Sequence, residues 1–163
     1  VLAFDGSDAT ARVHRIAIDD WKTDACPHHG AALAISAAGT YHVAWFTQGQ
    51  ARQGTFYARS QDRGVQFTPP RPVGNPAMQP GRAALLARGS HVWLAWKEFD
   101  GRRASVTLQH SADDGLTWSA PGKIAEVAGY SDHPLLLAQG GRVYLSWLTA
   151  ASGYRLIEVG KTP

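Results

Sequence analysis

Three short segments of this 163-residue chain carry side chains that can bind or transform a ligand. They are Cys-Pro-His-His-Gly at 26–30, Gln-Pro-Gly-Arg at 79–82 and Gly-Tyr-Ser-Asp-His-Pro at 129–134. Arginine binds a carboxylate through two parallel hydrogen bonds. Tyrosine attacks as a nucleophile when a base lies beside it, and thiolate with imidazole suits Zn²⁺ or copper. The segments form one site only if the fold brings them together.

Tryptophan residues reveal a repeat that would bring them together. Trp45, Trp96 and Trp147 are 51 residues apart, and each ends a stretch of alternating apolar residues that is typical of a β-strand. Two octapeptides follow the same register, Ser-Gln-Asp-Arg-Gly-Val-Gln-Phe at 60–67 and Ser-Ala-Asp-Asp-Gly-Leu-Thr-Trp at 111–118. A period near 50 that is built only of strands indicates propeller blades. The sequence therefore predicts an all-β chain made of blades of four antiparallel strands.

The two octapeptides predict a stapled turn rather than a reactive site. An Asp two residues after Ser can accept hydrogen bonds from nearby backbone N–H groups and close a turn. The Gly two residues further on permits a positive φ, and the final aromatic residue would pack under the turn. The residues expected to play these structural parts are Ser60, Asp62, Gly64 and Phe67, and Ser111, Asp113, Gly115 and Trp118.

The pattern Ser/Thr-x-Asp-x-Gly-x-x-Trp/Phe resembles the Asp box of the bacterial neuraminidase repeat. This resemblance implies a six-bladed sialidase-like propeller, of which the chain would supply about three blades, the C-terminal half. It also implies an extracellular or periplasmic location. No signal peptide is visible in the sequence, so that expectation depends on the resemblance alone.

The repeat divides the chain into one partial propeller, 1–163. Residues 1–25 are expected to form one or two outer strands of a preceding blade, at 12–18 and 21–25. Residues 26–76 and 77–127 form complete blades, and 128–163 an incomplete one. Their strands are expected at 31–37, 41–48, 54–60, 66–73, 83–88, 91–98, 104–111, 117–125, 134–139, 142–148 and 153–159. No helix is expected. Incomplete ends predict either a missing N-terminal half or a homodimer that closes the propeller.

The same register predicts where a ligand would bind. In a propeller, the segments that precede the inner strands meet at one mouth of the central channel. Ala31, Arg82 and His133 become equivalent, as do His28 and Tyr130. The predicted ligand-binding residues are His28, His29, Arg82, Tyr130, Asp132 and His133.

Three functions remain open for this mouth. The step Tyr130-Ser131 is similar to the nucleophilic tyrosine of sialidases, and the resemblance implies Tyr130 and Arg82 as catalytic residues of an exo-sialidase-like hydrolase. However, His28 and His29 stand where the family has its glutamate, and the Phe/Tyr-Arg-Ile-Pro motif is absent. We therefore favour binding of a glycan or another small ligand without standard sialidase catalysis. A metal site made by Cys26, His28 and His133 is a further alternative.

Composition and charge exclude several other classes of function. The formal net charge is +3, and the Lys and Arg residues are scattered, so no nucleic-acid partner is expected. No run of about 18 apolar residues is present, so no membrane span is expected either. A single cysteine excludes an internal disulfide. The sequence predicts no cofactor.

Overall fold

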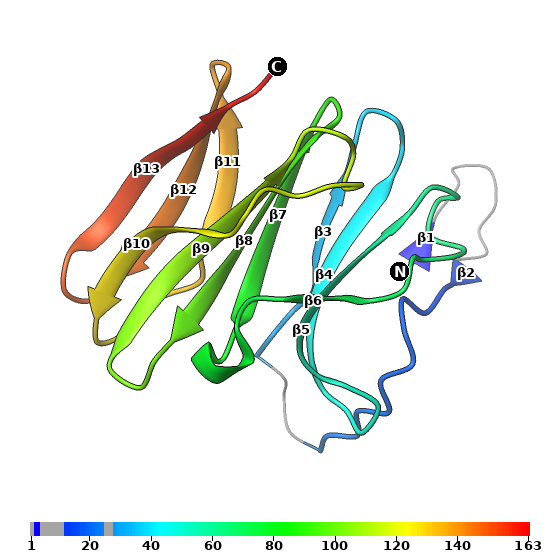
Figure 1. The fold of residues 1–163 in the computed structure, drawn as a ribbon, viewed down its shortest axis with the longest axis horizontal. Helices are drawn as coiled ribbons and strands as arrows, with labels where there is room; N and C mark the ends of the chain where they lie inside the picture. The colour runs from blue at the N-terminus through cyan, green and yellow to red at the C-terminus, as the bar shows by residue number, and fades with distance from the viewer. Residues whose placement is uncertain (1, 4–11, 25–27) are drawn as a thin grey trace.

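Three antiparallel sheets lie side by side and build the fold. The computed structural model describes residues 2–3, 12–24 and 28–163. Figure 1 shows the sheets in chain order, from the cyan first sheet to the red end of the third. In each sheet, strands that are consecutive in the chain are neighbours, so each sheet is a meander. This arrangement is that of successive propeller blades and confirms the predicted all-β fold.

The bounds of the strands follow the 51-residue register. The first sheet contains β3 (Ala32–Ile35), β4 (Tyr41–Gln48), β5 (Gln53–Ser60) and β6 (Arg71–Val73). The second contains β7 (Gly81–Arg88), β8 (His91–Phe99), β9 (Arg103–Ser111) and β10 (Gly122–Ala128). The third contains β11 (Leu135–Gln139), β12 (Arg142–Thr149) and β13 (Gly153–Lys161). A short ladder pairs β1 (Leu2–Ala3) with β2 (Arg12–Val13).

The prediction for residues 12–25 was wrong in its extent. Only Arg12 and Val13 form a strand there, and residues 14–24 form none, while Ala25 lies outside the described residues. Side chains anchor the segment instead of a ladder. The Asp19 carboxylate accepts hydrogen bonds from Trp45 Nε1 at 2.7 Å and from Arg52 Nη1 at 2.7 Å. A segment held in this way gains little from regular strand pairing.

Two outer strands begin later than predicted. They start at Arg71 and Gly122 rather than at 66 and 117, because the octapeptide turns occupy the residues before them. One turn of 3₁₀-helix, η1 (Pro76–Met78), was also not expected; the Asn75 side chain caps it by accepting from Ala77 N at 3.1 Å. No helix among the described residues is long and apolar enough to cross a membrane.

The core lies between the sheets. Trp96 of the second sheet packs among Ala44, Tyr57 and Val73 of the first, and Trp147 of the third sheet packs against the second. Both indoles are almost fully buried, at 1% and 0% exposed. Burial of side chains of this size supplies a large part of the energy that holds neighbouring sheets together. Each tryptophan therefore joins its own sheet to the preceding one.

The outer sheets keep apolar faces open. On the third sheet, five large side chains are about half exposed: Leu135, Leu137, Leu148, Tyr154 and Leu156. On the first sheet, Leu33 and Ile35 are similarly exposed. Trp45, the counterpart of the two buried tryptophans, is only partly buried there, beside a groove of about 650 Å³ formed with residues 14–22.

Candidate functional site

Arg82 links the first two of the three predicted segments. It lies at the start of β7, at a bulge, with a left-handed φ of 54°. Its Nη1 donates a hydrogen bond to the backbone oxygen of His28. The irregular backbone turns Arg82 out of the regular strand pairing and toward the preceding segment. We call this end of the sheets, where the segments before β3, β7 and β11 lie, the mouth.

His29 is the most enclosed of the histidines at the mouth. Its ring stacks on Phe46, with the centroids 4.4 Å apart, and it lies against Gly81, where a Cβ would come within 3.1 Å of His29 Cε1. Its Nδ1 is buried and has no hydrogen-bond partner. Burial lowers the pKa of His29, and the charges of Arg82, His133 and His28 lower it further. His29 is therefore a neutral ring with an unused polar atom at neutral pH.

Lys97 joins the site from the end of β8, and the sequence reasoning missed it. Its Nζ donates to the backbone oxygen of Ser131 at 2.7 Å and lies 5.9 Å from the centre of the Tyr130 ring. Burial lowers the pKa of Lys97, and so does the charge of Arg82. A signal was present in the repeat, because Phe46 and Leu148 occupy the equivalent positions. A lysine at a position that is otherwise apolar marks the place where a strand reaches a polar site.

The segment 130–133 is tied to the third sheet. Asp132 N donates to Leu148 O at 2.9 Å, Trp147 Nε1 donates to Asp132 O at 3.1 Å, and Ser131 bridges to Thr149. The side chains of Asp132 and His133 are exposed. Burial and the charge of Arg82 lower the pKa of His133, whereas Asp132 acts to raise it.

These contacts bring together all six residues predicted to bind a ligand. Among the described residues that these contacts connect, the mouth carries the cationic side chains of Arg82 and Lys97 and three histidines, and the one carboxylate among them is Asp132. The pKa values of His29, His133 and Lys97 are all lowered by the charge of Arg82. The site therefore has an excess of positive charge and of hydrogen-bond donors, which suits a ligand that carries negative charge or many oxygen acceptors.

Tyr130 lacks the partner that nucleophilic catalysis requires. Its side chain is 74% exposed. Within the described residues, no hydrogen bond joins its hydroxyl to a carboxylate or to a histidine. A tyrosine with an ordinary pKa of about 10 attacks poorly at neutral pH without a base.

The predicted metal ligands are only partly described. Cys26 lies outside the described residues. Among the residues that the structure describes, no group of three or more His, Cys, Asp or Glu side chains is arranged to hold a metal ion. His28 and His133 also lie beside Arg82, whose positive charge opposes a bound cation.

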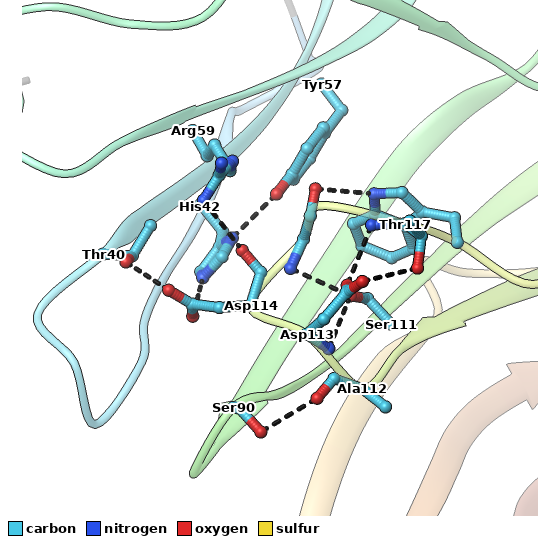
Figure 2. Close-up of polar contacts among 12 residues, drawn as sticks. Thr40, His42, Tyr57, Arg59, Ser90, Ser111, Ala112, Asp113, Asp114 and Thr117 are labelled. Carbon is cyan, nitrogen blue, oxygen red and sulfur yellow. Dashed lines mark hydrogen bonds and ion pairs between the residues drawn. The ribbon is translucent and has the colours of Figure 1, made fainter.

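The octapeptide turns lie at the opposite end of the sheets and form the predicted hydrogen bonds. In the second turn, Thr117 N donates to Asp113 Oδ1 at 2.8 Å, and Gly115 N donates to Ser111 Oγ at 2.9 Å (Figure 2). Gln66 N donates to Asp62 Oδ1 at 2.9 Å in the first turn. The hydrogen bond from Gln66 N, with that from the Ser60 hydroxyl, lowers the pKa of Asp62. The hydrogen bonds from the Thr117 hydroxyl and from Thr117 N lower the pKa of Asp113 to about 2.

A network beside the second turn was not predicted. The carboxylate of Asp114, the residue after Asp113, accepts a hydrogen bond from Thr40 Oγ1. Its Oδ1 lies 3.2 Å from Nε2 of His42 on the first sheet. His42 is fully buried, and its Nδ1 lies 2.7 Å from the Tyr57 hydroxyl. Figure 2 shows these side chains pointing toward one another across the junction of the two sheets. Burial raises the pKa of Tyr57, so this group is a structural partner rather than a reactive one.

Comparison with solved structures finds glycoside hydrolases. The chain superposes on an α-L-arabinanase from Penicillium chrysogenum, solved with arabinobiose, with a TM-score of 0.56 and 16% identity. It superposes on the Hadza microbial sialidase Hz136 with a TM-score of 0.59 and 19% identity. The superpositions show a shared fold, which agrees with propeller blades. At identities this low, they show the fold alone.

The alignments also show how much of those proteins the chain represents. They cover 82% and 94% of this chain, but the chain spans 49% of the arabinanase and 37% of the sialidase. No protein-family model and no curated protein matches the sequence.

Proposed function

We propose that the mouth binds a glycan, preferably one that carries a carboxylate, and that this chain does not hydrolyse it. The observation that carries the proposal is the convergence of Arg82, Lys97 and three histidines from consecutive sheets at one end, where Asp132 is the one carboxylate that acts on the pKa values of Lys97 and His133. A guanidinium group binds a carboxylate through two hydrogen bonds, and the buried Nδ1 of His29 is a polar atom without a hydrogen-bond partner.

We also propose that further blades cover the open faces of the first and third sheets. The third sheet has an open apolar face, and Trp45 on the first sheet is only partly buried. At the other junctions of the molecule, the corresponding surfaces pack against a neighbouring sheet. Exposed apolar surface of this extent favours association. Of the two arrangements that would cover it, an N-terminal half and a second copy, we favour the N-terminal half, which would also add side chains to the mouth.

Titration calorimetry with sialyllactose and lactose tests the binding. We expect saturable binding of sialyllactose, at least tenfold weaker binding of lactose, and loss of at least tenfold in affinity in Arg82→Ala. Arg142→Ala is the matched control, because Arg142 pairs with Glu158 at 2.7 Å on the third sheet and its loss leaves the mouth unchanged. Equal affinity for both sugars, or full affinity in Arg82→Ala, would overturn the proposal.

The same samples test the alternatives. Fluorogenic sialoside should remain intact, whereas turnover that disappears in Tyr130→Phe would establish the hydrolase instead. Light scattering measures the mass of the species that binds the ligand. A monomer would argue against closure of the propeller by a second copy, whereas a dimer would favour a second copy over an N-terminal half.

A further inference from the structure

Two histidines outside the mouth form a second cluster that the proposed function does not use. His91 begins β8, one residue after the turn that ends β7, and His110 lies near the end of β9. His91 Nδ1 and His110 Nε2 are 2.9 Å apart. Both side chains are partly buried, so solvent reaches the pair. The pair therefore combines access with a short separation between two ring nitrogens.

The surroundings hold both rings in place. Trp93, only 2% exposed, contacts both: its ring centre lies 5.8 Å from that of His91 and 4.8 Å from that of His110. The backbone of His110 is fixed from both sides, because Ser119 N donates to His110 O at 2.8 Å and His110 N donates to Ser119 Oγ at 3.0 Å. A preformed pair loses little conformational entropy when it binds a ligand.

The separation of the two nitrogens fits a pair of metal ligands. With metal–imidazole bonds of about 2.0–2.1 Å, two neighbouring ligands at a right angle are separated by about 2.9 Å, and tetrahedral ones by about 3.4 Å. We propose that His91 and His110 bind one first-row transition-metal dication of the Zn²⁺, Ni²⁺ or Cu²⁺ class, with water in the other coordination positions. Imidazole suits all three ions, and Cu²⁺ should bind most tightly.

The protonation state allows this. Burial lowers the pKa of His110, and the charge of His91 lowers it further, so the ring is neutral at neutral pH. In the hydrogen-bonded pair, one of the two facing nitrogens carries a proton. Metal binding moves that proton to the other nitrogen of the same ring, and both facing lone pairs then bind the ion. This change of tautomer releases no net proton.

The electrostatic setting distinguishes this pair from the histidines of the mouth. The groups that shift the pKa of His110 are its own burial and His91. His29 and His133, by contrast, have Arg82 acting on them. The charge of Arg82 therefore opposes a dication at the mouth, whereas at the pair the one cationic side chain that strand register places among the described residues is the exposed Arg88, opposite His91.

Calorimetric titration of the chain with Ni²⁺, and separately with Zn²⁺, tests the proposal. We expect one site in the unmodified protein and at least tenfold weaker binding in His91→Gln and in His110→Gln. The matched control is His133→Gln, which removes a mouth histidine and should bind the metal as before. Circular dichroism verifies that each variant is folded.

Two results would overturn the proposal. One is the absence of metal binding by the unmodified protein, and the other is a loss in His133→Gln that equals the loss in the pair variants. Because His110→Gln removes a partly buried ring and can also disturb folding, a spectrum of the unmodified protein provides the second measurement. Electron paramagnetic resonance with one equivalent of Cu²⁺ should show coordination by two imidazole nitrogens; a spectrum without nitrogen coordination would equally reject the site.

Discussion

The two octapeptide turns share one local design and differ in what they do for the fold. Both place Ser, Asp and Gly in the same hydrogen-bond pattern. In both, the fourth and fifth residues adopt positive φ, at Arg63 and Gly64 and at Asp114 and Gly115. Arg63 is exposed, and no hydrogen bond or ion pair joins its side chain to another residue in the described part of the chain. Asp114, at the equivalent position, binds Thr40 and His42 on the preceding sheet.

This difference shows how one residue converts a local staple into a contact between sheets. The turn is stable through its own hydrogen bonds, so the residue between Asp and Gly is free to vary. In the second turn this position is Asp114, whose carboxylate binds the buried His42. The other ring nitrogen of His42 lies within hydrogen-bond distance of the Tyr57 hydroxyl. Removing one member would leave the others buried without partners, which costs more than the hydrogen bond itself.

The largest effect is expected from Gly115→Ala. Gly115 has φ of 79°, and an added Cβ would collide with the Tyr57 hydroxyl and lie 3.2 Å from His42 Nδ1. We expect the free energy of unfolding to fall by about 3 kcal/mol. Gly101→Ala is the control: it has φ of 93° and open space around it, so only the backbone cost of about 1 kcal/mol applies. If urea unfolding shows that Gly115→Ala and Gly101→Ala lose the same free energy of unfolding, the contact between the first and second sheets adapts to the added methyl group and the prediction is wrong.

A smaller effect is expected from Asp114→Asn, which keeps the left-handed backbone but removes the charge. Hydrogen bonds to a charged group are stronger than neutral ones, so we expect a loss of about 1–2 kcal/mol in urea unfolding. Arg63→Asn makes the same residue at the equivalent position of the first turn and should change stability by less than about 0.5 kcal/mol. If both variants lose the same amount, the contact between the sheets contributes nothing.

The smallest effect is expected from pH. Burial lowers the pKa of His42 below its ordinary 6.5; Asp114 opposes this shift, and Arg59 adds to it. As pH falls through 6.5, the unfolded chain takes up a proton before the folded one, so stability is present above that pH and lost below it. One proton gives a slope of at most about 1.4 kcal/mol per pH unit.

Unfolding curves between pH 7 and 5 measure this slope. His29, His110 and His133 have the same sign of shift, so the contribution of His42 is the difference between the unmodified protein and His42→Asn. A variant that loses stability with acid as steeply as the unmodified protein would contradict a role for His42.

Much of the fold could be predicted because it depends on repeated local features. The register of Trp45, Trp96 and Trp147 located the second strand of each sheet, β4, β8 and β12, and the octapeptides located the outer turns within a few residues. The strands predicted at 12–18 and 21–25 failed because Asp19 anchors that segment through Trp45 and Arg52. Hydrogen bonds between side chains that are distant in the chain leave no periodic pattern to detect.

The sequence by itself determined the all-β repeat, the stapled turns and the set of polar residues at the segments before the inner strands. Each of these follows from residue types at a fixed spacing, because a turn or a strand is decided by near neighbours. Only the tertiary structure brought Lys97 to Ser131, His42 to Asp114 and His91 to His110. These contacts depend on how one strand or sheet packs against the next, and packing depends on the whole set of buried side chains rather than on any local pattern.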